Sequence, residues 1–558
     1  MKKVPKIWNY CLVNIKLLKG ILRFYEMGDD GLNLKICEVA GSFIERTKDK
    51  EILVVSHFDT DGISSATIAI KALRRMDRTF SVKIVKSLER EFILGLPKDK
   101  VILFLDLASS SFSHMEDAGL SDVFILDHHE VSSEVPSFVN IVNSQLHDKE
   151  KLSGAGITYL FFKEIDEENI DSSKIAVLGM IGDRMEKEIE KITNGIVSDG
   201  EIVKKRGPLI YPSTRPLNRT LEFCSSPYIP EVTGDIRGVL ELLREAGLGL
   251  PNGGYPSLLD LDEEEMGKLT TAIMLRNPKV KHEELIGDIF LIKMFNKLED
   301  ARELSAMINA CSRSGDSELA IRVLLEIPNA KKDAEKVHVK HKQFIVAGLK
   351  YVKETHDKIE GEGFILINGG EELKDTIAGT VGSILSSSNI YSDGTAIITT
   401  AYYEDKVKVS IRRCGREGDN LREILASIIS KFDGEVGGHE FAAGGIIKQS
   451  QEDEFIHEVR MFFEPEVVEG EKKKKVEAKE KVELAVKNGE VEQSVDVKED
   501  SPEDFDVWGK KKVVEEEKVE AVEKVMEDPA EKNDIVEPLV EKGSIVVEQS
   551  IPLGQTQL

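Results

Sequence analysis

The chain of 558 residues is too long for one ordinary core, and its 41% hydrophobic and 32% charged residues are typical of a soluble protein with two or three domains. The net charge of −26 excludes a uniformly basic surface, so a nucleic-acid partner would have to bind in a local groove. No apolar run reaches the ~20 residues of a membrane span, and the five cysteines form no CxxC pair; we therefore expect no membrane association, no zinc site, no disulfide framework and a cytoplasmic location.

Residues 1–50 form an N-terminal extension without a clear cleavage site, so we expect no signal peptide. The segment 51–190 then alternates between strand and helix patterns. Apolar runs predict strands at 51–56, 81–85, 101–106, 122–127 and 138–143, with helical patterns between several of them. This alternation predicts an α/β domain with a parallel sheet and helices on its faces, in which ligands bind beyond the carboxyl ends of the strands.

Carboxylate and imidazole side chains follow three of these strands. The first strand leads to His57, Asp59 and Asp61, the third to Asp106, and the fourth to Asp127, His128 and His129, while Asp183 follows a helical pattern at 175–181. A single aspartate after a strand is usually a helix cap or a turn residue, and a single histidine is usually a structural hydrogen-bonding group. Together, however, these side chains favour a divalent-metal site at one sheet edge, because Mn²⁺ and Mg²⁺ prefer oxygen and imidazole ligands.

The rest of the chain predicts four further segments. Residues 191–295 form the remainder of the catalytic lobe, which is loop-rich to residue 256 and has an ordered insertion at 214–219, and residues 296–360 form a linker with helices at 300–321 and 337–359. Residues 361–464 form a smaller α/β domain with strands at 364–367, 395–403 and 406–412 and helices at 376–385 and 421–432. Residues 465–558 form an acidic, lysine-rich tail. The tail has too few apolar residues to offset its ordering entropy, so we expect it to be disordered.

A glycine-rich motif near the end of the smaller domain surrounds a histidine. Gly437 and Gly438 precede His439, and Gly444 and Gly445 follow five and six residues later. Glycines on both sides of a histidine favour close approach of the backbone to a ligand, although a flexible turn would explain them equally well.

The motifs around His57, Asp106, Asp127 and Asp183 resemble those of the DHH phosphoesterase superfamily, and the glycine-rich motif resembles that of the DHH-associated domain. Arg302-Glu303-Leu304, the segment 309–313 and Ser410-x-Arg412 are similar to the RecJ branch. The insertion with Thr214-Arg215-Pro216-Leu217 is similar to archaeal RecJ-like exonucleases, including the GINS-associated nuclease group. Bacterial RecJ proteins carry an aspartate where this chain has His57, and the resemblance covers about residues 50–463.

The resemblance implies two Mn²⁺ or Mg²⁺ ions. His57 and Asp59 would bind one ion, Asp61, His128 and Asp183 the other, and Asp106 would bridge them. The catalytic residues would be Asp127 and His129, with His129 facing the scissile phosphate. Substrate phosphates would be bound by Arg412, His439, Gly437, Gly438 and, as a weaker candidate, Arg313.

The function that this reading favours is a single-strand-specific exonuclease of replication or repair, acting on DNA and also on RNA. A nano-RNase or a cyclic-dinucleotide phosphodiesterase is the alternative within the enzymes, and the insertion favours a longer substrate only by analogy. A replisome subunit with a mainly structural role is the third reading, with the tail recruiting a partner such as GINS. The residue types favour neither 5′–3′ nor 3′–5′ polarity.

Overall fold

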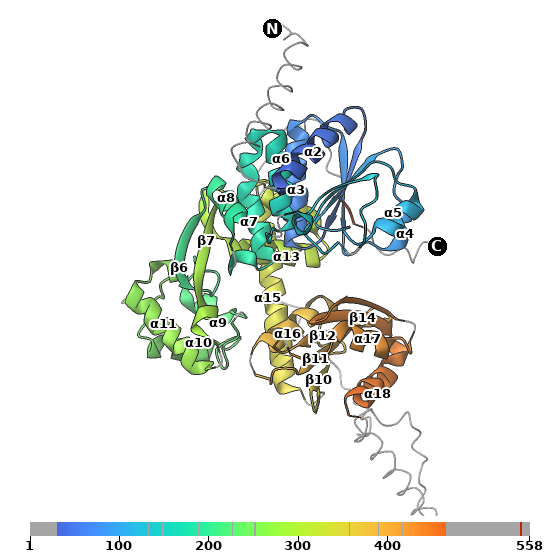
Figure 1. Cartoon of the computed structure of the whole chain (residues 1–558). Coiled ribbons are helices and arrows are strands. Elements are labelled where there is room, and N and C mark those ends of the chain that lie inside the picture. The colour runs from blue at the N-terminus through green and yellow to red at the C-terminus, as the bar shows by residue number, and fades with distance from the viewer. Residues whose placement is uncertain are drawn as a thin grey trace, which may run out of the picture. The chain divides into compact units, whose positions relative to one another are not determined.

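The computed structural model describes residues 31–464, with gaps at 132, 148–149, 188, 226, 250–252, 279, 356–357, 389, 416 and 433, and it also describes residues 547–549. The described residues divide into two compact units (Figure 1). The first runs to Glu354 and includes Ser383–Ile390 and the strand at 547–549, and the second comprises Thr355–Gly382 and the described residues from Tyr391 to 464.

The first unit contains the parallel sheet that the sequence predicts. Its strands are β1 (Ile52–His57), β2 (Phe80–Val85), β3 (Val101–Leu105), β4 (Val123–Leu126), β5 (Val139–Val142) and β15 (Val547–Gln549), in the spatial order β15-β2-β1-β3-β4-β5. All pairs in this sheet are parallel. The five predicted strands and the α/β fold class are therefore confirmed, and β1, β3 and β4 are neighbours.

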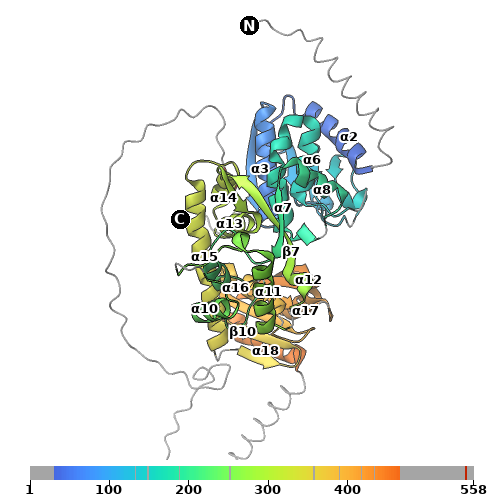
Figure 2. The same ribbon diagram turned by 90° about the vertical axis from the view of Figure 1, so that its left-hand side faces the viewer.

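Both faces of this sheet are buried, because successive side chains of each strand enter different cores. On one face Val54 and Leu103 pack with α2 (Gly31–Arg46), α3 (Thr60–Arg75), α6 (Gly154–Ile165) and α7 (Ser173–Gly182). On the other face Val55 and Phe104 pack with α4 (Arg90–Leu94) and α5 (Phe112–Ala118). Figure 2 shows α3, α6 and α7 side by side.

Helix α2 lies within the segment that the sequence analysis assigned to an N-terminal extension. It buries Leu32, Ile36, Val39 and Phe43, and the Phe43 ring meets the Phe124 ring of β4 edge-on at 5.1 Å. The core of the first unit therefore begins before residue 51, and residues 1–30 lie outside the described part of the chain.

The stretch at 191–256, which the sequence predicts to be loop-rich, has long connections at 209–216 and 223–235, but it also contains α8 (Lys191–Asp199), β6 (Val203–Pro208), α9 (Leu217–Glu222) and α10 (Ile236–Glu245). The remaining elements of the first unit are α11 (Glu263–Arg276), α12 (His282–Leu285), β7 (Ile286–Met294), β8 (Lys297–Asp300), α13 (Ala301–Arg313), α14 (Ser317–Leu324) and α15 (Ala330–Glu354). Strands β6, β7 and β8 form an antiparallel sheet, and Val239, Leu242 and Leu243 of α10 enter a separate core.

The two linker helices also differ from their predicted bounds. The single helix expected at 300–321 is interrupted between α13 and α14 at Gly315, whose φ of 87° is left-handed and ends a helix. Helix α15 begins seven residues before the predicted start at 337 and ends at Glu354, because the chain after it forms a strand at 358–361.

The second unit contains the predicted smaller α/β domain. Its elements are β9 (Lys358–Gly361), β10 (Phe364–Asn368), α16 (Asp375–Ser387, whose residues from Ser383 on count with the first unit), β11 (Ala396–Tyr403), β12 (Lys406–Arg413), α17 (Leu421–Ile429), β13 (Glu435–His439), β14 (Ala442–Lys448) and α18 (Glu452–Phe463). The strand order is β13-β14-β12-β11-β10-β9, with β10 and β11 parallel and the other pairs antiparallel. The glycine-rich motif is thus a hairpin of β13 and β14 and not a flexible turn.

The predicted disordered tail, apart from residues 547–549, lies outside the described residues. Those three residues form β15, a strand that the sequence analysis did not predict, and it pairs with Val82, Lys83 and Ile84 of β2. No helix in the described part of the chain is long and apolar enough to cross a membrane.

Candidate metal centre

The eight side chains predicted to lie at the sheet edge meet at the carboxyl ends of β1, β3 and β4. Asp183 joins them from the C-terminal end of α7. They form overlapping groups, in each of which one ligand atom per residue lies within 4.8 Å of the others: His57, Asp59 and Asp106; Asp61, His128 and Asp183; and Asp106, Asp127, His128 and His129. The structure therefore brings all eight residues together, while their roles stay predictions.

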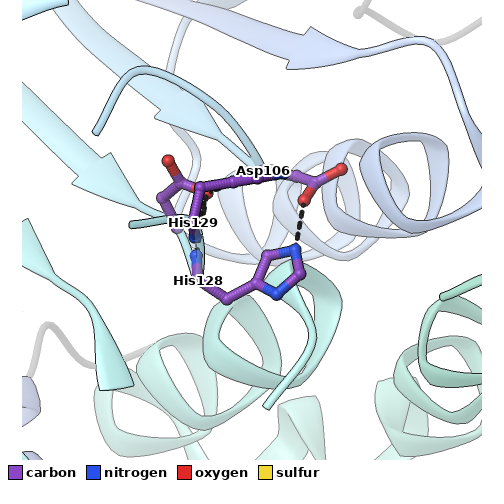
Figure 3. Close-up of side chains that lie close together, drawn as sticks. Asp106, His128 and His129 are labelled. Atoms are coloured by element: carbon purple, nitrogen blue, oxygen red, sulfur yellow. Dashed lines mark hydrogen bonds and ion pairs between the residues drawn. The ribbon is translucent and has the colours of Figure 1, made fainter. Parts of the chain in front are cut away.

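Asp106 lies between the first two groups and faces each with a different oxygen. Its Oδ2 is 3.5 Å from His57 Nδ1, which is itself 3.1 Å from Asp59 Oδ2. Its Oδ1 is 3.2 Å from His128 Nε2, as Figure 3 shows. His128 Nε2 is also 3.3 Å from Asp183 Oδ2 and 3.9 Å from Asp61 Oδ2. This central position is the one that a bridging carboxylate requires.

The donor set fits divalent cations. Asp106 is 1% exposed, yet its two oxygens and His57 Nδ1 make no well-aligned hydrogen bond and have only the close imidazole–carboxylate contacts given above. Buried polar atoms without a well-aligned hydrogen bond are rare and costly, so their occurrence together indicates a missing ligand. Carboxylate oxygens and imidazole nitrogens are the ligands that Mn²⁺ and Mg²⁺ take.

The electrostatics of the site support the same conclusion. Burial, followed by the charge of Asp61, raises the pKa of Asp106 well above its usual value. Burial, followed by the charges of Asp61 and Asp106, raises the pKa of Asp183 to about 9. These carboxyl groups repel one another when they are ionised together, and a bound dication would remove that repulsion.

Asp61 is held by the first turn of α6. Its carboxylate accepts hydrogen bonds from the backbone N–H groups of Gly154 (2.5 Å) and Ala155 (3.0 Å), and the residue is fully buried. A Cβ atom at Gly179 of α7 would overlap Asp61 Oδ1, and one at Gly154 would lie 2.7 Å from Asp106 Cβ. Sequence reasoning missed both glycines; the small-residue run from Gly154 to Gly156 was the available signal.

The backbone of Asp106 is in the left-handed region, with φ of 58°. Few non-glycine residues adopt this conformation, and Asp and Asn tolerate it better than most because their short polar side chains can bond locally. The turn follows β3 directly, so the Asp106 carboxylate lies between the two groups of ligands.

Asp127 supports His129. Its Oδ1 is 2.7 Å from His129 Nδ1, its Oδ2 accepts from the Ser109 backbone N–H at 3.0 Å, and Asn143 Nδ2 donates to the His129 carbonyl oxygen at 2.9 Å. The hydrogen bond that His129 donates to Asp127, opposed by partial burial, raises the pKa of His129. The His129 side chain is 56% exposed, so its Nε2 is accessible to a substrate.

Arg313 lies within the first unit beside the segment at the end of β1 that contains His57, Asp59 and Asp61, here called the metal loop. Its guanidinium is 5.6 Å from the centre of the Phe58 ring, and its Nε donates to Asn309 Oδ1 at 3.2 Å. Helix α13 also contacts this loop through Thr60 Oγ1, which donates to the Ser305 carbonyl oxygen at 3.0 Å. The position next to the loop agrees with the predicted substrate binding, and it agrees equally with a structural role in which Arg313 attaches the linker helix to the core.

The other predicted substrate-binding residues belong to the second unit and form a group of their own. Arg412 on β12 and His439 on β13 are both registered opposite Ala442 of β14, so their side chains leave the same face of the sheet. Arg412 Nη1 donates to the Ala443 carbonyl oxygen at 3.0 Å. Gly438 has φ of 124°, and a Cβ there would overlap the Ala442 carbonyl, so this position requires glycine.

Three family models match the chain in succession. The model of the DHH family N-terminal domain matches residues 51–182, that of the DHH-CID domain matches residues 210–284, and that of the DHHA1 domain matches residues 365–464. The DHH match contains the predicted site residues from His57 to His129 and ends one residue before Asp183, and the DHHA1 match contains Arg412 and His439. Arg313 lies in none of the three matches.

Among known proteins, an uncharacterized protein of Methanocaldococcus jannaschii, MJ0831, is 27% identical over 73% of this chain and 92% of its own length. The structure of CDC45 from Entamoeba histolytica has a TM-score of 0.59 at 11% identity, covering 77% of this chain and 99% of that one. RecJ from Thermus thermophilus, solved with Mn²⁺, has a TM-score of 0.48 at 18% identity over 78% of this chain, which spans about half of that protein (55%). At such identities the structural likeness concerns the fold alone. With its DHH, DHH-CID and DHHA1 domains in this order, the chain belongs to the DHH family.

Proposed function

We propose that the protein is a divalent-metal-dependent phosphodiesterase that acts as a single-strand-specific exonuclease on DNA, and on RNA as well, in replication or repair. The observation that carries this proposal is the position of Asp106, which faces one group of imidazole and carboxylate ligands with each oxygen. Two ions that share one carboxylate are a recurring arrangement for phosphodiester hydrolysis.

The ligands divide between two ions as the geometry groups them. His57 and Asp59 would hold one ion, and Asp61, His128 and Asp183 the other, with Asp106 common to both. Bound divalent ions would supply Lewis-acid stabilisation of the negative charge that develops on the phosphate during hydrolysis.

The protein's own groups bind and orient the substrate. Asp127 fixes the tautomer and the orientation of His129 through Nδ1, and it favours the imidazolium form, so Nε2–H donates to an oxygen of the scissile phosphate. Arg412 and His439, which leave the same sheet face, would bind phosphates of the strand, and the glycines of β13 would let its backbone approach closely.

The proposal is tested by incubating the purified protein with Mn²⁺ and end-labelled single-stranded and duplex oligonucleotides. We expect stepwise shortening of the single strand, protection of the duplex, and loss of activity in EDTA. Asp127→Asn should lower kcat by about 100-fold or more while the circular dichroism spectrum is kept, because His129 loses its orienting carboxylate. Asp99→Asn, at an exposed turn, is the matched control. Intact single strands, or full activity of Asp127→Asn, would contradict the proposal.

Substrate length separates the exonuclease from a nano-RNase or a cyclic-dinucleotide phosphodiesterase. The exonuclease should prefer oligonucleotides over dinucleotides in kcat/KM, and the opposite preference would favour the smaller substrates. A replisome partner such as GINS is tested separately: a chain ending at residue 464 should keep its nuclease activity and lose the partner in a pull-down. Loss of the basal nuclease activity in that truncated chain would contradict this division of labour.

A further inference from the structure

A pocket lies within the first unit, apart from the candidate metal ligands. Its volume is about 360 Å³, within the range of about 300–1,000 Å³ that is usual for small-molecule sites. The residues that carry the argument are Arg215, Arg219, Phe223, Met307, His338 and Lys342. Met307 belongs to α13, the helix whose Ser305 contacts the metal loop, so this helix takes part in both sites.

His338 is the polar group that indicates a ligand. The residue is 5% exposed and lines the pocket, and neither of its ring nitrogens makes a well-aligned hydrogen bond; its interaction with the Ala306 backbone is a weak one. Burial, followed by the positive charges of Lys342, His341 and Arg215, lowers the pKa of His338 to about 3. The imidazole is therefore neutral and offers one donor and one acceptor, which a bound molecule could satisfy.

The charges around His338 favour an anion. Arg215 is paired with Glu303 (3.4 Å) and Glu335 (3.3 Å), and Arg219 is paired with Glu222 (3.0 Å). Lys342 forms no ion pair among the described residues, and its ammonium lies 6.0 Å from the centre of the Tyr211 ring. One cation of the pocket thus has no carboxylate bound to it.

The remaining wall of the pocket is apolar. Phe223, Met307 and Val339 line it together with Pro212 and Pro216. An aromatic ring beside a thioether and proline rings offers a surface on which a flat heterocycle stacks well. The complementary ligand therefore has a flat apolar body, edge groups that both donate and accept hydrogen bonds, and an anionic group.

We propose that this pocket binds one nucleotide unit, with the base against Phe223 and Met307, its edge hydrogen-bonded to His338, and its phosphate at Lys342. The nucleotide is either a free nucleoside monophosphate or a residue of a bound single strand, since the two share this chemistry. The pocket contains none of the predicted metal ligands, so the proposal holds or fails independently of the proposed hydrolysis.

The test is isothermal titration calorimetry of the full chain in EDTA, where no metal-dependent turnover occurs. The probes are AMP, adenosine, inorganic phosphate and a short oligodeoxyadenylate. We expect AMP, the oligonucleotide or both to bind. Lys342→Met and His338→Met should weaken this binding by about 10-fold or more, the loss typical of one charge-assisted or buried hydrogen bond.

His341→Met, on the same helix but outside the pocket lining, is the matched control and should bind as the natural chain does. Because His338 makes no well-aligned hydrogen bond, His338→Met should leave the melting temperature nearly unchanged or raise it, and this measurement separates weaker binding from unfolding. Binding of AMP alone assigns the pocket to free nucleotides, and variant-sensitive binding of the oligonucleotide alone assigns it to a strand. Equal affinity for inorganic phosphate and AMP, equal effects of His341→Met, or no binding by any nucleotide probe would overturn the proposal.

Discussion

Replacing Asp183 by asparagine should raise the stability of the metal-free chain above pH 4 and reduce the additional stability that a bound metal ion provides. Burial and the charges of Asp61 and Asp106 raise the pKa of Asp183 from its usual 3.8 to about 9 in the folded protein. The folded, metal-free chain therefore binds more protons than the unfolded chain between about pH 4 and 9, and its stability falls as the pH rises through this window. Asp183→Asn removes this proton difference and also removes one proposed metal ligand.

The size of the effect follows from linkage. A difference of one bound proton corresponds to about 1.4 kcal/mol per pH unit. For a domain of about 150–250 residues this equals about 3–5 °C in melting temperature per pH unit, as an upper bound because neighbouring carboxyl groups share the effect. Near pH 4 the variant and the natural chain should melt alike, and at pH 8 in EDTA the variant should melt higher.

The assay is differential scanning calorimetry of both proteins from pH 4.5 to 8.5, in EDTA and with Mn²⁺. Saturating Mn²⁺ at about 100 times its dissociation constant should stabilise the natural chain by about 2.7 kcal/mol, and the variant by less. Asp99→Asn is the control, since its exposed carboxyl lies away from the site. A variant that melts lower than the natural chain in EDTA at pH 8, or one that keeps the full stabilisation by Mn²⁺, would refute the reasoning.

Two further predictions concern glycine and arginine positions. Gly179→Ala should reduce the stabilisation by Mn²⁺ and lower the turnover at least 10-fold, because the new methyl group overlaps the Asp61 carboxylate. Gly195→Ala is the control and should be neutral or slightly stabilising, because no atom lies within 4 Å of the added Cβ. Equal effects of the two substitutions would contradict the packing argument. Arg412→Ala should raise KM for single-stranded DNA about 10-fold in steady-state kinetics, and calorimetry should show an unchanged Mn²⁺-dependent rise in melting temperature. An unchanged KM would remove Arg412 from the proposed strand-binding residues.

The sequence identifies the residues of the candidate metal centre well because most of these residues come at the carboxyl ends of predicted strands. His57, Asp106 and Asp127 come directly after or within a residue of buried apolar runs, and the parallel pairing of β1, β3 and β4 brings them together without further information. For this reason both the fold class and the meeting of these side chains at one edge of the sheet were predictable. The grouping of His57 with Asp59, and of Asp61 with His128 and Asp183, came from the family resemblance and agrees with the distances.

The parts that could not be predicted depend on tertiary contacts. Gly154 and Gly179 matter only because α6 and α7 approach the Asp61 and Asp106 side chains; the small-residue run at 154–156 indicates a close approach but does not identify the side chain that it meets, and no such run surrounds Gly179. The short strand β6, with exposed Val203 at its start, lacks the apolar alternation of a typical strand and is recognised only through its pairing with β7. The pocket residue His338 has no sequence signature either, since it sits on a long helix rich in lysine and histidine.

The left-handed backbone of Asp106 has a consequence for the preparation of an inactive protein for co-crystallisation. Alanine and glutamate are poorly accommodated at φ of 58°, so Asp106→Ala or Asp106→Glu would disturb the loop after β3 as well as the ligand set. Asparagine keeps both the shape and the tolerance of this conformation. Asp106→Asn is therefore the substitution of choice for co-crystallisation trials with a proposed substrate, because it leaves the conformation of the loop after β3 unchanged.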